Sequence, residues 1–296
     1  MLPAFVFRWM KESSATGFLR FGRKPNVRVQ DGEKRYWLGR CCEDCFNQWE
    51  TPFSAQVFYP LIANGAQRIR YGDWMLKYCV SVSWRVLSMF VEDSPLSHFN
   101  DRQRGAVALA LKKWAGFLLG TELNPGVYEQ HLLPLDSVES FTGGNMPSNI
   151  NRYLLRAADI DVVAGGGGAF VYSKFAKFIL VGFIDVPNPK EWVGTKIHVR
   201  DGHVGQGNFT LPKEFGDFIF DKCRRYAEIK EEISENQRAK IAASMRKDLE
   251  RVAGSETFKA LHQDVTLFGK EAFRPVNYAV NYGDTLLNKL ISHHFL

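Results

Sequence analysis

The sequence of 296 residues lacks an apolar run long enough to span a membrane. Its two most apolar stretches are 74–91, which Lys77 and Arg85 interrupt, and 175–186, which is only as long as a long strand. The first ten residues have no basic segment before their apolar run and no small-residue cleavage site, which argues against a signal peptide. We therefore expect a cytoplasmic protein with no membrane partner.

The sequence has too few cysteines for a disulfide-rich fold: it has five, an odd number. Three of them, Cys41, Cys42 and Cys45, crowd into five positions, while Cys79 and Cys223 stand alone on apolar faces of expected helices. Such a set suits a metal or redox role in a reducing compartment better than a framework of disulfide bonds. Cys79 is expected to be a buried core thiol.

Motifs of several large enzyme classes are missing. The sequence has no Gly-x-Ser-x-Gly elbow, no His-Glu-x2-His helix and no kinase motif set, so it names no covalent nucleophile. The glycine run at 165–168 is not followed by Gly-Lys-Ser/Thr, as a phosphate-binding loop would be, and predicts a hairpin loop instead. Catalytic residues stay unknown at this level.

Positive charge is concentrated in the first forty residues of the sequence. The chain holds 38 Lys and Arg against 32 Asp and Glu, a net charge of +6, and residues 1–40 alone hold nine basic against three acidic residues. A local surplus of this kind predicts a polyanionic partner, most simply nucleic acid or a ribonucleoprotein. Six cations are interleaved with aromatic residues that can stack on unpaired bases. They form the predicted nucleic-acid-binding set: Arg20, Arg23, Lys24, Arg28, Arg35 and Arg40.

Two other interpretations of this basic segment stay open. Its aromatic residues can pack inward and leave only a solvated ribbon. Its cations can also meet an acidic protein surface, because positive charge alone does not select nucleic acid.

The pattern of apolar residues predicts an α+β fold built as one compact unit. We expect four segments in chain order: a basic hairpin and cysteine knuckle over 1–60, a core of buried helices over 61–147, an antiparallel β meander over 148–211, and C-terminal helices over 212–296.

Individual elements follow from local periodicity and turn residues. A mostly buried helix is predicted over 72–91, and a second helix after the cap residue Asn100. The expected strands cover 153–163, 169–174 and 177–186, and a hairpin about Asp201-Gly202 is expected to join 195–199 to 204–209.

Three residue pairs have the spacing of metal ligands. Cys42 and Cys45 form a Cys-x2-Cys pair that can place two thiolates on one zinc ion, although a tetrahedral site needs four ligands. Zinc is thus the one cofactor that the sequence suggests, and a turn with buried thiols is the alternative. The other two pairs are less specific: His198 with His203 on the expected hairpin, and Asp159 with Asp161 on one face of a strand.

The first ninety residues carry a further set of motifs: Leu2-Pro3-Ala4-Phe5, Gln30-Asp31-Gly32, Cys42-x2-Cys45, Trp49-Glu50, Phe53, Tyr59-Pro60 and Trp84-Arg85-Val86-Leu87. In these motifs the sequence resembles a group of bacterial HNH-type treble-clef proteins, some of which are encoded among anti-phage defence genes. The resemblance implies a degenerate treble-clef-like hairpin and knuckle. It also implies an effector or toxin, such as a retron-associated toxin, that acts on or with nucleic acid and has a neutralising partner encoded nearby.

The sequence departs from that group at one point. Proteins of that kind carry a further Cys pair and a His before the segment that corresponds to Leu2-Pro3, and no residue here matches them. The general base of an HNH nuclease therefore has no counterpart, and we expect at most a degenerate nuclease. The alternative is a non-catalytic interaction subunit that docks on a partner protein or ribonucleoprotein through its basic hairpin.

Overall fold

A computed structural model describes the following residues: 2–16, 43–65, 67–93, 96, 99–142, 145–165, 168–205, 207–231 and 234–273. They divide into two compact units. The described residues of the first unit lie within 2–6, 43–136 and 158–216, and those of the second unit lie within 7–16, 137–157 and 217–273.

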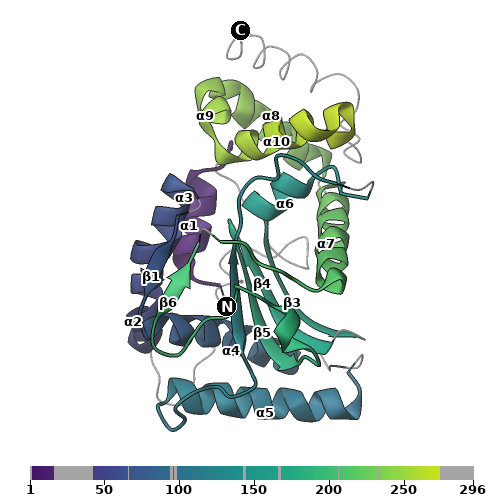
Figure 1. The fold of residues 1–296 in the computed structure, drawn as a ribbon. Coiled ribbons are helices and arrows are strands. Elements are labelled where there is room, and N and C mark those ends of the chain that lie inside the picture. The colour runs from purple at the N-terminus through teal and green to yellow at the C-terminus, as the bar shows by residue number, and fades with distance from the viewer. Residues whose placement is uncertain are drawn as a thin grey trace. The chain divides into compact units, whose positions relative to one another are not determined.

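The described chain is a mixed α+β structure with antiparallel sheets, as predicted (Figure 1). Its α-helices are α1 (Ala4–Glu12), α2 (Glu43–Phe53), α3 (Tyr59–Asn64), α4 (Trp74–Asp93), α5 (Asp101–Leu118), α6 (Ile150–Arg156), α7 (Lys213–Glu231), α8 (Glu235–Lys247), α9 (Leu249–Gly254) and α10 (Glu256–Phe268). Shorter helical turns are the π-helical Ser54–Phe58 and the 3-10 turns Pro189–Glu191 and Gly269–Phe273. Its strands are β1 (Ile69–Tyr71), β2 (Gln130–Pro134), β3 (Ala158–Gly165), β4 (Gly168–Phe175), β5 (Phe178–Asp185) and β6 (Gly202–Val204).

Both helices predicted before residue 120 are present as α4 and α5. The start of α5 is fixed by a reciprocal cap, because Asn100 Oδ1 accepts a hydrogen bond from the backbone N–H of Gln103 (2.9 Å) while Gln103 Oε1 accepts one from the N–H of Asn100 (3.1 Å). The prediction that this helix is mostly buried is confirmed, and Cys79 within α4 is fully buried.

The main sheet of the first unit is antiparallel, with strand order β2-β5-β4-β3. α4 packs across one face of this sheet and contacts all four strands, and α5 packs beside α4 (Figure 1). The close approach of α4 depends on Gly182 in β5, where an added Cβ would lie 2.6 Å from Ser83 Oγ of α4. The same Ser83 hydroxyl donates a hydrogen bond to Gln130 Oε1 in β2 (2.7 Å).

Aromatic rings fill the core between α2, α4 and the sheet. Phe53 at the end of α2 is fully buried and stacks on Tyr78 of α4, with ring centroids 3.8 Å apart. The Phe53 ring also contacts Phe178 of β5 (5.7 Å). Each buried ring of this size contributes a large hydrophobic free energy to the stability of the first unit.

One charged residue of α4, Arg85, faces α2. Arg85 is buried, donates a hydrogen bond to Glu50 Oε1 of α2 (2.6 Å), and lies over the ring of Phe46 at 4.7 Å from its centroid. The arginine therefore joins α2 to α4, and its charge is compensated within the first unit.

Two expected elements are wrong. Residues 153–156 belong to α6, and β3 begins only at Ala158. The hairpin about Asp201-Gly202 does not form either, because β6 pairs antiparallel with the distant β1 and not with residues 195–199. In both cases residues far along the chain determine the outcome. β6 pairs with β1 instead of forming a local hairpin, and α6 is stabilised by Asp264.

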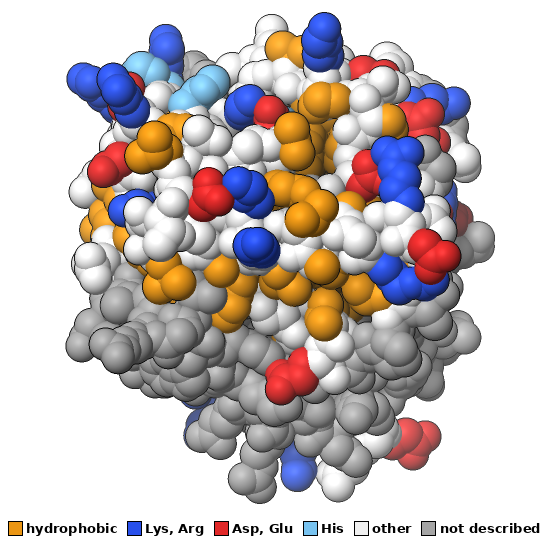
Figure 2. Space-filling view, turned by 90° about the horizontal axis from the view of Figure 1, so that it is seen from below, with side chains coloured by type: hydrophobic (Ala, Val, Ile, Leu, Met, Phe, Trp, Pro, Cys, Tyr) orange, Lys and Arg blue, Asp and Glu red, His pale blue; other side chains and the backbone are white. Residues whose placement is uncertain are grey.

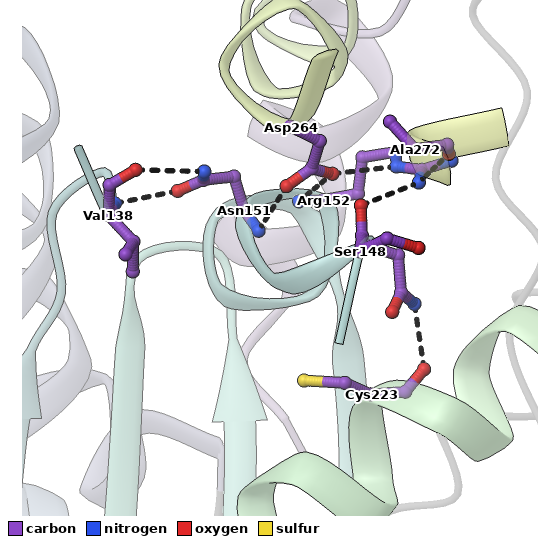
Figure 3. Close-up of polar contacts among 8 residues, drawn as sticks. Val138, Ser148, Asn151, Arg152, Cys223, Asp264 and Ala272 are labelled. Atoms are coloured by element: carbon purple, nitrogen blue, oxygen red, sulfur yellow. Dashed lines mark hydrogen bonds and ion pairs between the residues drawn. The ribbon is translucent and has the colours of Figure 1, made fainter. Parts of the chain in front are cut away.

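In the second unit, Asp264 of α10 explains why α6 is helical. Its two carboxylate oxygens accept hydrogen bonds from the backbone N–H groups of Asn151 (2.8 Å) and Arg152 (3.2 Å), which are donors that the first turn of a helix leaves unsatisfied (Figure 3). Arg152 Nε also donates to Asp264 (2.7 Å), so the buried carboxylate is paired in charge as well. Burial raises the pKa of Asp264 above its ordinary value, although the Arg152 guanidinium opposes that shift.

A second arginine anchors the other end of α6. Arg156 donates hydrogen bonds to Ser13 Oγ (2.7 Å) and to the backbone carbonyl of Met10 (2.8 Å), and its guanidinium lies over the ring of Trp9 at 4.8 Å from the centroid.

Among the described residues, no helix combines the length and the apolar character needed to cross a bilayer.

Candidate functional site

The residues predicted to bind nucleic acid or zinc fall largely outside the described part of the chain. This holds for the six cations Arg20, Arg23, Lys24, Arg28, Arg35 and Arg40, and for Cys42. Cys45 lies in the first turn of α2, but its side chain is not described either.

A second group of cations is described, on the two-stranded ribbon that β1 and β6 form. The register pairs Arg70 with His203 and Tyr71 with Gly202. Tyr71 is buried, and its hydroxyl accepts a hydrogen bond from the backbone N–H of His198 (3.1 Å), which fastens the segment before β6 to the ribbon. Because side chains alternate along a strand, burial of Tyr71 leaves Arg70 on the outer face.

The outer face of the ribbon is basic and exposed. Arg70 is 75% exposed at its side chain and pairs loosely with Asp201 (3.2 Å), which is also exposed. Arg68 Nη2 lies 3.4 Å from His203 Nδ1, so this imidazole nitrogen accepts the hydrogen bond. Arg68 and Arg200 have no carboxylate partner among the described residues. In Figure 2, histidines and Lys or Arg side chains gather at the upper left of the face shown. We call this surface the cation ribbon: Arg68, Arg70, His198, Arg200 and His203.

The chemistry of the cation ribbon suits an oligoanion. A guanidinium carries five N–H donors in a fixed planar fork, which matches the oxygens of a phosphate. The ribbon's one carboxylate, Asp201, occupies only part of the donor capacity of Arg70.

Next to the ribbon lies a polar cluster on the edge of β2. His131 Nδ1 lies 2.8 Å from Thr195 Oγ1, and His131 Nε2 lies 3.5 Å from Glu129 Oε2, which is long for a hydrogen bond. Glu129 Oε1 in turn accepts a hydrogen bond from Lys196 Nζ (2.5 Å). The backbone of the same segment adds to the sheet edge, because the N–H of Leu132 donates to the carbonyl of Thr195 (2.9 Å).

Burial divides this cluster into a hidden part and an accessible part. Desolvation by burial lowers the pKa of His131, and the neighbouring Glu129 carboxylate opposes that shift. The His131 imidazole, and after it the Lys196 ammonium, hold the pKa of Glu129 below its ordinary value. Since His131 and Thr195 are almost fully buried, no substrate reaches them, and they position the segment that carries the accessible Lys196.

The two weaker metal-ligand pairs do not build a site. Asp159 and Asp161 do lie on one face of β3, opposite Lys174 and Tyr172 of β4, and Asp161 Oδ1 accepts a hydrogen bond from the N–H of Val162 (2.8 Å). His198 and His203 do not face each other across a hairpin, because β6 pairs with β1. The described residues hold no group of three His, Cys, Asp or Glu side chains that could bind a metal ion.

Sequence reasoning missed the cation ribbon. Arg68 and Arg70 have the alternation of a strand, which is a weak signal, and they are separated from Asp201 and His203 by more than 130 positions. Counting charges within a short window of the sequence therefore could not bring the arginines of β1 together with the residues near β6.

Comparisons of the chain with protein-family models, with curated proteins and with solved structures each found no match.

Proposed function

We propose that the protein binds nucleic acid through phosphate contacts and acts as an effector, or toxin, of a bacterial anti-phage defence system. The observation that carries the binding part is the exposed cation ribbon, whose arginines stand on a folded two-stranded support. The basic segment within residues 1–40 adds nine further cations in the sequence. The effector part rests on the resemblance of the first ninety residues to HNH-type treble-clef proteins.

The finer assignments belong to the same proposal. One of them is a degenerate treble-clef-like arrangement within residues 1–60, with Cys42 and Cys45 as the candidate zinc ligands. The described residues of this range are mostly helical, in α1, α2, the π-helical turn Ser54–Phe58 and the start of α3, and not in a hairpin. No third ligand is assigned, and no catalytic step is derived through zinc. Elemental analysis of the purified protein tests the metal content directly.

The binding proposal is tested by titrating labelled single- and double-stranded DNA and RNA with the full chain at several salt concentrations. Phosphate contacts release counterions, so we expect the affinity to fall steeply as salt rises. The variant Arg68→Ala/Arg70→Ala should bind about tenfold more weakly at low salt and should reduce the salt slope by about two. Its fold should persist, because both arginines are exposed and contribute little to stability.

The chain offers a matched control in a second pair of exposed arginines two positions apart. Arg102 and Arg104 of α5 are occupied by carboxylates, Asp185 (2.8 Å) and Asp101 (2.6 Å). The variant Arg102→Ala/Arg104→Ala removes the same charge, and it should leave the affinity within about twofold of the native value. Equal losses in both variants, or binding that does not depend on salt, would contradict a specific role for the ribbon.

The contribution of the basic segment is measured separately with Arg20→Ala/Arg23→Ala/Lys24→Ala. The effector part is tested by expression in a bacterial host. If the protein is a toxin, its expression should arrest growth, and the product of a neighbouring gene should relieve the arrest. The variant Arg68→Ala/Arg70→Ala should arrest growth less strongly than the native chain. Normal growth at full expression would contradict this part while leaving nucleic-acid binding intact.

The same cations support a second candidate function, a non-catalytic subunit that docks on an acidic protein or a ribonucleoprotein. The loose pairing of Arg70 with Asp201 is the observation that favours it, because a carboxylate already occupies this arginine. A complex that forms on a purified acidic partner and survives nuclease treatment distinguishes this function from direct nucleic-acid binding.

A further inference from the structure

A hollow in the first unit is lined by α4, by the turn that joins α5 to β2, and by the segment that precedes β6. Its apolar lining comes from Leu76, Pro125, Ile197 and Val199. Its volume of about 270 Å³ is just below the roughly 300–1,000 Å³ of pockets that bury drug-sized ligands. The hollow can therefore take one small ring system but not a longer ligand.

The walls of this hollow are held in place by hydrogen bonds within the first unit. On one side, the N–H of Ile197 donates to the carbonyl of Gln130 at the edge of the main sheet (2.9 Å). On the other side, Asn124 Oδ1 accepts a hydrogen bond from the N–H of Gly126 (2.9 Å). A hollow that is formed before its ligand arrives costs that ligand little free energy of ordering.

The hollow is continuous with the cation ribbon. His198 belongs to the ribbon and also lines the hollow. Two positions further on, Arg200 is exposed and has no carboxylate partner among the described residues. Figure 2 shows apolar side chains close to the histidines and the basic side chains at the upper left of this face. Hydrogen-bond donors that suit a phosphate therefore lie directly beside an apolar hollow.

The charges separate what fits inside the hollow from what fits beside it. Glu129 lines the hollow, and the His131 imidazole and the Lys196 ammonium hold the pKa of its carboxyl below the ordinary value, so the group is negatively charged. A phosphate inside would meet this carboxylate and apolar side chains, whereas outside it would meet His198 and Arg200. A neutral ring is therefore favoured inside the hollow and an anion beside it.

We propose that the hollow receives one unpaired base of a single-stranded nucleic acid whose phosphates lie on the cation ribbon. A nucleotide joins a neutral flat ring to a phosphate, which is the combination that the two neighbouring surfaces require. The Asn124 amide and the Glu129 carboxylate also offer a donor and an acceptor to the edge of a base. This inference rests on the proposed function and narrows its ligand to single strands, because the bases of a duplex are stacked and paired.

The inference is tested with two single DNA strands of equal length and equal phosphate count, oligothymidylate and an abasic strand. We expect the full native chain to bind oligothymidylate about fivefold more tightly or more, because only that strand can bury a base. Both affinities should fall equally with salt, since the phosphate contacts are the same. Equal, salt-dependent affinities would overturn this inference and leave the proposed function standing, whereas failure to bind either strand would contradict both.

The variant Val199→Met tests whether the preference comes from the hollow. Val199 is 40% exposed, so the fold should persist, and the longer methionine side chain takes up part of the hollow. We expect the preference for oligothymidylate over the abasic strand to be lost, while the affinities for the abasic strand and for duplex DNA stay unchanged. The matched control is Val91→Met, at a valine of α4 that is 44% exposed and lies outside the lining, and it should keep the preference. A preference that survives Val199→Met, or a parallel loss of duplex binding, would contradict the inference.

Photo-crosslinking locates the base by a second measurement. A strand with 4-thiothymidine at one position should attach to a peptide that contains Pro125 or Val199, which mass spectrometry identifies. Cross-links confined to residues 1–40 would place the base on the basic segment and overturn the inference. Complete displacement of the strand by thymidine monophosphate would also overturn it, because a free nucleotide lacks the further phosphates that reach Arg68 and Arg70. Circular dichroism verifies that each variant is folded.

Discussion

His131 is only 1% exposed, and its ring stacks on Phe183 with centroids 4.2 Å apart. Burial lowers its pKa, so the folded protein keeps the imidazole neutral at a pH where the unfolded chain already binds a proton. Stability must then decrease as the pH falls through the unfolded-state pKa of about 6.5 towards the lower folded-state value.

The expected loss from this one group is at most about 1.4 kcal/mol between pH 7.5 and pH 5.5. His131→Gln removes the titrating ring and should flatten this part of the profile, although it lowers stability at every pH because the stacking is lost. Urea unfolding of both proteins at three pH values measures the effect. Glu129, whose pKa is also lowered, contributes only below about pH 4.5 and does not interfere. Equal slopes in the two proteins would show that His131 is not the group responsible.

Single residues could be predicted from the sequence where their neighbours are local. Asn100 as a helix cap and Cys79 as a core thiol are confirmed, because both follow from positions within one turn of the chain. Arg68 and Arg70 gave no comparable signal. They become part of a basic surface only through residues more than 130 positions away.

At the scale of elements, the ribbon of β1 and β6 depends on one glycine. Gly205, directly after β6, has a φ of +100°, a conformation that L side chains rarely adopt. A Cβ atom there would also lie 1.8 Å from the carbonyl oxygen of Gln67, which directly precedes Arg68. A side chain at this position would therefore force the two strands apart.

We expect Gly205→Ala to destabilise the ribbon by about 2 kcal/mol or more. The matched control is Gly207→Ala, where the nearest atom to an added Cβ is the Gly205 carbonyl oxygen at 3.7 Å, an ordinary contact. Hydrogen exchange of the β1 amides measures the loss of protection. If the ribbon binds nucleic acid, Gly205→Ala also weakens binding while Gly207→Ala does not. Unchanged protection of β1 in Gly205→Ala would contradict the close packing of Gly205 against the Gln67 carbonyl.

Elements defined by their own periodicity were predicted well. α4, α5, β4 and β5 all lie where the pattern of apolar residues places them, because each buries a face that the local sequence encodes. α6 was mistaken for a strand, since its seven residues are too few to show a helical period. Its helical state is stabilised by Asp264, 113 positions from Asn151, and no local pattern contains that contact.

At the scale of the whole molecule, each compact unit is assembled from three separate stretches of chain. In the second unit, α6 comes from the middle of the sequence and its charge partner Asp264 from near the end. The second unit is therefore complete only once α10 is present, and a contiguous N-terminal piece that stops before α10 leaves buried groups of α6 without partners.

This connectivity predicts the behaviour of shortened chains. A chain that ends at Gly216 retains Asn151 and Arg152 but lacks Asp264, so the first-turn N–H groups and the guanidinium of α6 lose their acceptor. Loss of a buried charge partner typically costs about 3–5 kcal/mol. This is a large part of the free energy of unfolding of a typical domain, about 5–15 kcal/mol. We expect this chain, in which the first unit is complete, to bind a hydrophobic dye and to lose the hydrogen-exchange protection of the α6 amides. A chain that ends at Phe273 retains Asp264, and also Ala272, whose carbonyl accepts a hydrogen bond from Arg152 Nη2, and it should keep that protection. Co-expression of residues 217–296 as a separate chain should restore the protection in the shorter piece, because the missing carboxylate is then supplied in trans. Protected α6 amides in the chain ending at Gly216 alone would mean that α6 does not need Asp264 in order to fold.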